Sequence, residues 1–219
     1  MFNYEEIKWK GIVERIASNG DFNYLDTRIS YNGFSQQAKQ QINPRWGQQL
    51  SVVYQNSLSS REATQTLARA SLYVPGFAKT HSIVLQGAWQ GRDTLLNYVY
   101  TNNFPFARGY TKLNYPRMWR FNANYHLPLF YPDWGFANIV YFLRVRANLF
   151  YDYTAIKSLR TGNTGSFRST GTEIYFDTKW WNQQTVSFGI RYSRLLDNDA
   201  ANRNPNQWEF VLPVSLYNL

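Results

Sequence analysis

Residues 138–153 read NIVYFLRVRANLFYDY, and the alternation within this stretch decides the fold class. A period of two residues over such a length is typical of a β-strand with one apolar and one polar face. Strands that cross a membrane at a tilt need about 9 to 11 residues, so this stretch is long enough. We expect one unbroken apolar row, with Arg144, Arg146, Asn148 and Asp152 on the opposite face. The apolar row would consist of Ile139, Tyr141, Leu143, Val145, Ala147, Leu149, Tyr151 and Tyr153.

The same alternation recurs along the whole chain. It is clear in 117–127 and 185–193. Weaker copies occupy 22–31, 48–55, 64–74, 80–90, 167–180 and 207–217, and a further strand is expected within 4–17. Turn-forming pairs such as Asn32-Gly33 and Pro75-Gly76 separate several of these segments. Roughly ten strands joined by turns predict an all-β, antiparallel meander.

The composition limits the alternatives. The chain has 219 residues, no cysteine and a mean hydropathy of −0.49, and it fits a single domain, 1–219. No stretch approaches the roughly 18 apolar residues of a membrane-spanning helix, so a helical membrane protein is excluded. The first 21 residues lack a basic segment followed by an apolar one, so they do not form a secretory signal peptide. We expect that a leader has been removed or that the chain begins within a longer polypeptide.

Two all-β architectures produce such alternation, and the polar rows decide between them. A soluble sandwich has strands of about five or six residues and turns its polar rows to water. Here the polar rows of long strands carry charges at close quarters, namely Arg144, Arg146, Glu173, Asp177, Lys179 and Arg191. A polar interior and an apolar exterior are typical of a transmembrane antiparallel β-barrel.

Aromatic residues favour the same architecture. Amphipathic rings gather where a membrane meets water, which is where the strands of a barrel end. The aromatic residues at or near expected strand ends are Trp119, Tyr131, Trp134, Tyr151, Tyr153, Trp180, Trp181 and Trp208. We therefore expect two aromatic girdles.

The chemistry-bearing residues predict no catalytic or metal site. The net charge is +9, but Lys and Arg are spread singly instead of forming one patch, which argues against nucleic-acid binding. The two histidines, His81 and His126, have neither a Cys partner nor metal-ligand spacing. Ser82 follows His81, and neighbours on a strand point to opposite faces, so these two cannot cooperate. We expect no enzyme activity, no cofactor and no metal site.

A long insert at about 91–116, between two expected strands, carries the most specific motif. It contains Phe106-Ala107-Arg108-Gly109-Tyr110. This motif resembles the Arg-Gly-aromatic signature of the sixth extracellular loop in the BamA-type superfamily of outer-membrane assembly factors and two-partner-secretion transporters. In that family the loop folds into the lumen and its arginine contacts the barrel wall. The resemblance implies the same roles for Arg108, Gly109 and Tyr110.

The strands after this loop support the resemblance. As in the family, five expected strands follow: 117–128, 138–154, 167–180, 184–195 and 207–219. The second of them carries a Phe-x-Asp-x-Gly pattern in the family, and this chain has Phe150, Asp152 and Thr154 there, so threonine replaces glycine. We expect Arg108 to pair with Asp152, and Glu173 to be a second acceptor on the lumen wall, because a buried guanidinium needs such a partner. The alternative is a solvated Asp152 with no specific partner.

The resemblance also implies a barrel larger than this chain. Family members close with sixteen strands, so about ten would form the C-terminal portion of a longer barrel or be completed by a second chain. A small self-closed barrel of eight or ten strands is the alternative. Two features depart from the family: the chain ends in Leu219 instead of an aromatic residue, and it contains no periplasmic domain.

By resemblance, the function would be insertion or translocation of polypeptides at the bacterial outer membrane. The expected partners are outer-membrane lipid, polypeptide clients or other outer-membrane subunits. A passive porin-like channel is one competing function, with a cationic lumen lined by Arg144, Arg146 and Arg191. A structural subunit of an outer-membrane complex is the other.

Overall fold

The computed structural model describes residues 2–7, 20–38, 41–93, 100–101, 103–137, 139–158, 162–181, 183–198 and 204–212. Within these ranges the chain forms eleven β-strands and no helix. The strands are β1 (Phe2–Ile7), β2 (Gly20–Phe34), β3 (Gly47–Ser57), β4 (Thr64–Pro75), β5 (Ser82–Arg92), β6 (Arg117–Phe130), β7 (Trp134–Phe136), β8 (Val140–Lys157), β9 (Thr164–Trp180), β10 (Gln184–Leu195) and β11 (Asn206–Val211).

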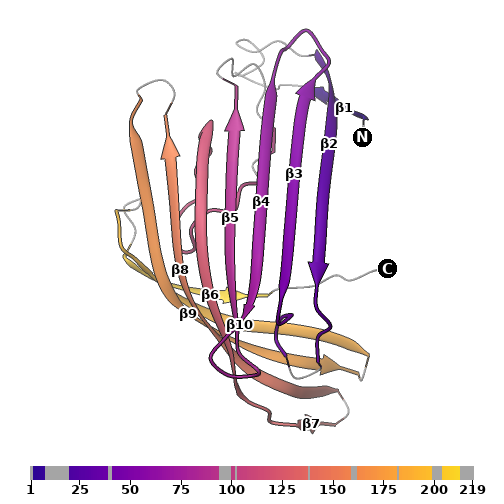
Figure 1. The fold of residues 1–219 in the computed structure, drawn as a ribbon, viewed down its shortest axis with the longest axis vertical. Coiled ribbons are helices and arrows are strands. Elements are labelled where there is room, and N and C mark those ends of the chain that lie inside the picture. The colour runs from indigo at the N-terminus through magenta and orange to yellow at the C-terminus, as the bar shows by residue number, and fades with distance from the viewer. Residues whose placement is uncertain are drawn as a thin grey trace.

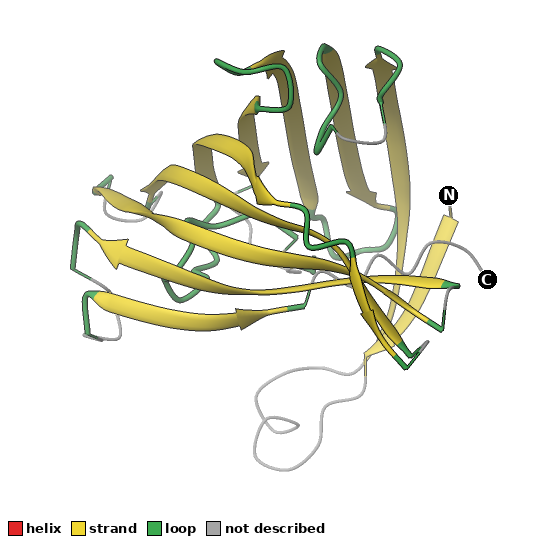
Figure 2. Cartoon of the chain, turned by 90° about the horizontal axis from the view of Figure 1, so that it is seen from below, coloured by secondary structure: helices red, strands yellow, loops and turns green. Residues whose placement is uncertain are grey.

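Ten of the strands form one antiparallel meander in chain order, and the short β7 lies off this path and pairs with β8. The predicted all-β meander of about ten strands is therefore confirmed. The sheet bends into a deep trough (Figures 1 and 2). Among the described residues β1 and β11 each have one neighbour, so the sheet is not closed there.

The two terminal strands are found, and β11 is shorter than predicted. The strand expected within 4–17 is β1, which ends at Ile7, and residues 8–19 lie outside the described part of the chain. The strand expected at 207–217 is β11, which ends at Val211, and residues 213–219 also lie outside it. No helix in the described ranges is long and apolar enough to cross a membrane.

The two faces of the sheet carry different side chains. The face opposite the long loop, here called the outer face, exposes large apolar residues, and Trp119 and Ile190 are 50% and 49% exposed. The concave face toward the loop, here called the inner face, carries polar side chains, and Asn122, Asp152 and Ser169 on it are fully buried. The alternation in the sequence therefore separates an apolar outside from a polar inside.

A β-bulge near the start of β8 changes the side of the sheet to which the side chains before it point. The register between β8 and β9 shifts between Phe142 and Arg144, which leaves Leu143 as an extra residue. Such an insertion reverses the direction of every side chain on one side of it. Tyr141 consequently pairs with Lys179 of the polar row. The prediction of one unbroken apolar row that includes Tyr141 is therefore wrong.

Aromatic side chains lie near both ends of the outer face. Toward the end where the long loop leaves the sheet, the rings of Trp119 and Tyr153 pack with centroids 5.1 Å apart. At the opposite end Trp134 and Trp181 are 57% and 62% exposed. The outer face thus has aromatic rings at its two margins and aliphatic residues such as Ile190 between them.

The bulge predicts which engineered cysteines form a disulfide between β8 and β9. The chain has no cysteine of its own, so the pair Phe142→Cys/Thr178→Cys should crosslink on oxidation because these residues are direct partners. A regular strand would pair residue 142 with residue 179 instead, which makes Phe142→Cys/Lys179→Cys the matched control. Gel mobility with and without reductant measures the crosslink, and a disulfide in the control pair alone would contradict the bulge.

Candidate functional site

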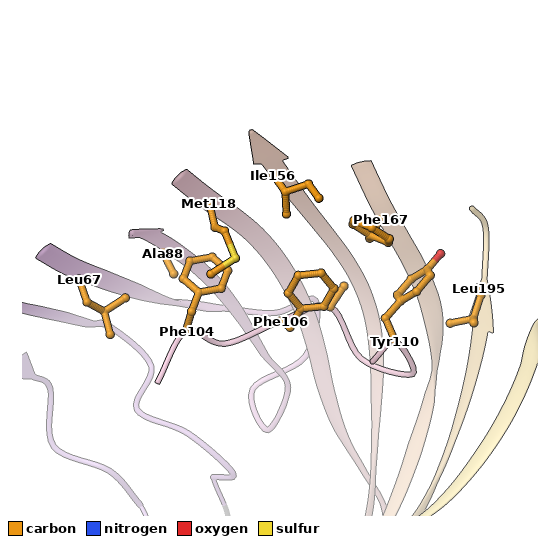
Figure 3. Packing of buried hydrophobic residues seen from close by; sticks show 10 residues of the cluster. Leu67, Ala88, Phe104, Phe106, Tyr110, Met118, Ile156, Phe167 and Leu195 are labelled. Carbon is orange, nitrogen blue, oxygen red and sulfur yellow. The ribbon is translucent and has the colours of Figure 1, made fainter. Parts of the chain in front are cut away.

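The long loop between β5 and β6, residues 93–116, returns onto the inner face of the sheet. Its described part places Phe104, Phe106, Ala107 and Tyr110 in a buried apolar cluster (Figure 3). The sheet supplies one residue from each of six strands, namely Leu67, Ala88, Met118, Ile156, Phe167 and Leu195. These six residues, here called the apolar belt, cross an otherwise polar face. Burial of apolar surface between loop and belt stabilises the docked loop.

Arg108 contacts Asp152, as expected from the sequence. Arg108 Nε lies 2.8 Å from Asp152 Oδ2 and Nη2 lies 3.0 Å from Oδ1, while the Arg108 backbone N–H donates to Oδ2 at 2.9 Å. This two-pronged geometry is the strong and directional form of an arginine–carboxylate pair. The Asp152 side chain is fully buried. The alternative of a solvated Asp152 with no specific partner is not what the structure contains.

The guanidinium of Arg108 has further partners on the wall. Nη1 lies 3.2 Å from Glu173 Oε1, the second acceptor expected from the sequence, and Nη2 donates to Asn124 Oδ1 at 2.8 Å. Its Cζ lies 3.6 Å from the centre of the Phe150 ring, which is a cation–π contact. All three guanidinium nitrogens therefore have an acceptor, and one flat face of the group rests on an aromatic ring.

Asp152 accepts hydrogen bonds from the wall as well as from the loop. Arg120 Nη2 lies 3.0 Å from Asp152 Oδ1, and the amide of Asn122 donates to the same oxygen. Asn148 completes the network, because its amide donates to Glu173 Oε2 at 2.6 Å and to Asn124 Oδ1 at 3.0 Å. Buried charges are stable only when they are paired and hydrogen-bonded, and this network meets that condition.

Gly109 lies where no side chain fits. Its φ is +83°, a region that residues with a Cβ rarely adopt. A Cβ added there would lie 2.8 Å from Leu195 Cδ2 and 2.9 Å from Ser193 Cβ, both on β10. The glycine thus allows the loop backbone to touch the wall directly after Arg108.

Tyr110 ties the loop to the ends of β9 and β10. Its hydroxyl oxygen lies 2.8 and 3.0 Å from the carbonyl oxygens of Arg168 and Asp197, which share its one hydrogen as acceptors, and it accepts from the Asp197 backbone N–H at 2.9 Å. Its ring packs edge-on against Phe167, with centroids 5.3 Å apart. Arg168 also holds the Asp197 carboxylate by hydrogen bonds, which lowers the pKa of Asp197. Each residue of the Arg108-Gly109-Tyr110 motif therefore has its own contact with the wall.

A close approach between strands occurs at Gly171 of β9, next to the strand that carries Thr154. Thr154, which replaces the glycine of the family pattern, is fully buried. Phe150 pairs directly with Gly171 of β9. A Cβ at Gly171 would lie 2.8 Å from the Phe150 ring and would also meet the carbonyl of Tyr192. Gly171 thus leaves room for the ring on which Arg108 rests.

The three arginines expected to line the lumen all lie on the inner face, but they pair with carboxylates. Arg144 and Arg146 both contact Asp177, at 2.7 and 3.1 Å. Arg191 contacts Glu173 and, through Nη1, Glu209 at 2.8 Å. Arg191 therefore shares Glu173 with Arg108 and belongs to the same network, whereas Arg144 and Arg146 form a separate group with Asp177.

Sequence reasoning missed two parts of the site. The apolar belt was one, although residues such as Met118 and Ile156 interrupt the polar rows near strand ends. The wall arginine Arg120 and the three asparagines at 122, 124 and 148 were the other. All four residues lie on the polar rows of two neighbouring strands, which is the one indication that the sequence offers. Polar residues are common in such rows, so their position alone does not identify a binding partner.

Among the described residues no cluster of three or more His, Asp or Glu could hold a metal ion. Comparisons of the chain with protein-family models, with characterised proteins and with solved structures returned no match.

Replacing Arg108 by alanine is expected to release the loop from the wall. The change leaves the buried Asp152 with Arg120 and Asn122 alone, and breaking a buried pair from one side costs about 3 kcal/mol. Limited proteolysis of folded protein should show faster cleavage within residues 93–116, and urea titration should show the loss of stability. Arg108→Lys is the control, since it keeps the charge without the planar fork. Its cleavage rate and its stability in urea should lie between those of the wild type and those of Arg108→Ala. Equal protection of the loop in wild type and Arg108→Ala would contradict this role.

Replacing Gly109 by alanine separates backbone strain from the clash with β10. Gly162 also has a positive φ, of +70°, but a Cβ there would meet nothing within 4 Å. Gly162→Ala should therefore cost only the strain of the left-handed conformation, about 1 kcal/mol. Gly109→Ala carries the same strain and the clash, so it should be the more destabilising of the two in urea titration. Equal losses would mean that the loop is not pressed against β10.

Proposed function

We propose that this chain is part of a bacterial outer-membrane β-barrel that acts in the insertion or translocation of polypeptides. In this proposal the docked loop shapes the lumen, and release of the Arg108–Asp152 contact is coupled to opening of the seam beside the last strand. The rest of the barrel would come from the same polypeptide or from a second chain.

Strand length and the outer face support a place in the membrane. Eight strands have 11 to 18 residues, and about 9 to 11 are enough to cross a bilayer at a tilt. Large apolar side chains are exposed along the outer face, for example Phe121, Leu149 and Ile174 at 44%, 48% and 40%. An apolar surface of this extent is unfavourable in water and favourable in lipid.

The observation that carries the functional part of the proposal is the docking of the Arg108-Gly109-Tyr110 motif. All three residues contact the inner wall, and the arginine binds Asp152 on the second strand after the loop, as the family pattern implies. Gly109 touches Ser193 and Leu195 of β10, the strand that pairs with β11. The loop is thus in contact with the strand next to the proposed seam.

The Arg108→Ala variant tests this function in cells that carry it in place of the wild-type protein. We expect less heat-modifiable barrel protein in the outer membrane, or less polypeptide secreted, while the anion preference of the purified protein in planar bilayers is unchanged. Arg144→Ala is the matched control, because it removes another inner-face arginine that contacts Asp177 outside the Arg108 network. That variant should leave assembly and secretion at the wild-type level.

Two outcomes would contradict the proposal. An altered anion preference in Arg108→Ala, with assembly and secretion intact, would favour the porin-like channel. Identical migration of boiled and unboiled wild-type protein, together with solubility in the absence of detergent, would contradict the membrane barrel itself.

A further inference from the structure

The inner face beside the Arg108 network carries a second group of cations. Arg69 of β4, Arg120 of β6 and Lys112 of the long loop line a cavity of about 400 Å³. Arg69 also lines an adjoining cavity of about 220 Å³, together with Arg28 of β2. Asn103 also lines both cavities, so the two cavities lie side by side with Arg69 and Asn103 between them.

Carboxylates are scarce among the described residues that line the two cavities. Among the residues that line the two cavities, Asp26 is the one carboxylate, and it accepts a hydrogen bond from Gln55 at 3.2 Å. The half of the inner face formed by β6 to β10 differs, because Asp152, Glu173 and Asp177 there each contact two or more arginines. Arg120 is paired with Asp152, so Arg28, Arg69 and Lys112 are the lining cations that have Asp26 as the one lining carboxylate, and this excess of positive charge attracts anions.

We propose that the larger cavity binds a small soluble anion that carries two or more negative charges, such as a molecule with phosphate groups. The larger cavity falls within the range of about 300 to 1,000 Å³ that is usual for small-molecule sites. Arginine side chains match the geometry of phosphate and carboxylate oxygens, and Ser71 and Gln86 add neutral donors to the lining. This site is independent of the polypeptide-handling role proposed above.

Two arginines of the site are held in place by the protein. Arg69 Nη2 donates to the backbone carbonyl of Asn103, which fixes its guanidinium between the cavities. Arg120 Nη2 is held by Asp152, while its buried Nε–H has no hydrogen-bond partner among the described residues. A buried donor without a partner is unfavourable, and an acceptor oxygen of a bound anion would satisfy it.

The charge of the ligand follows from the number of cations that line the larger cavity. Arg28 and Arg69 line the smaller cavity, and Arg69, Lys112 and Arg120 line the larger one. Three cations line the larger cavity, so an anion with two or more negative charges can pair with more than one of them, which a singly charged ion cannot do. The site also lies on the inner face, away from the apolar outer face, which favours a soluble ligand over a lipid headgroup.

Calorimetric titration of the detergent-solubilised full chain with inorganic pyrophosphate, at low ionic strength, tests the site. We expect saturable binding to the wild type, weaker binding of orthophosphate, and a loss of affinity of about tenfold or more in Arg69→Gln. Arg45→Gln is the matched control, because it removes the same charge from an exposed residue outside both cavities. Its affinity should stay within about twofold of wild type.

Failure of the wild type to bind pyrophosphate would overturn the proposal. So would equal weakening by Arg69→Gln and Arg45→Gln, which would indicate diffuse attraction to net positive charge. If Arg69→Gln does not fold, Lys112→Gln replaces it, since Lys112 is an exposed loop residue that lines the larger cavity. Wild-type affinity in Lys112→Gln would then count against the site.

Discussion

A carboxylate with no exposed surface has to be matched by positive charge, and at Asp152 this requirement joins two separate parts of the chain. One arginine, Arg120, comes from the wall, and the other, Arg108, comes from the long loop. Undocking of the loop therefore removes the bidentate partner of Asp152 and leaves the buried carboxylate with the single contact from Arg120 and the amide of Asn122. Neighbouring strands take part as well, because Asn122 of β6 donates to Asp152 and Glu173 of β9 contacts Arg108. Undocking of the loop should consequently lower the stability of the inner face, because a buried ion that loses a partner raises the free energy of the folded protein.

The apolar belt explains how such a polar face can hold a loop at all. Hydrogen bonds and ion pairs give the loop its orientation, but they compete with water, so their net contribution is small for each bond. Phe104, Phe106 and Tyr110 instead bury apolar surface against residues of six strands. Asp152 and Asn122 of the Arg108 network are fully buried, and ion pairs become stronger where water is scarce. The inner face thus combines a dry region that binds the loop with an open cationic region in β2 to β5.

Much of this arrangement could be predicted from the sequence, because two-residue periodicity reports directly on which face a side chain takes. The pairing of Arg108 with Asp152 followed from a motif and from the order of the strands after it. The bulge at Leu143 could not be predicted, since residues 139–143 are all apolar and fit either register. The belt was also hidden, because an apolar residue near a strand end has no identifiable partner until the path of the loop is known.

The stacking of Arg108 on Phe150 has a kinetic consequence. The ring covers one flat side of the guanidinium, so the bonds that hold the group lie at its edge, and every nitrogen is engaged by Asp152, Glu173 or Asn124. Shifting the group out of plane weakens all of these bonds at once, and no half-detached position keeps some of them at full strength. The loop should therefore behave as a two-position element, docked or free, with rare and abrupt departures in place of gradual loosening.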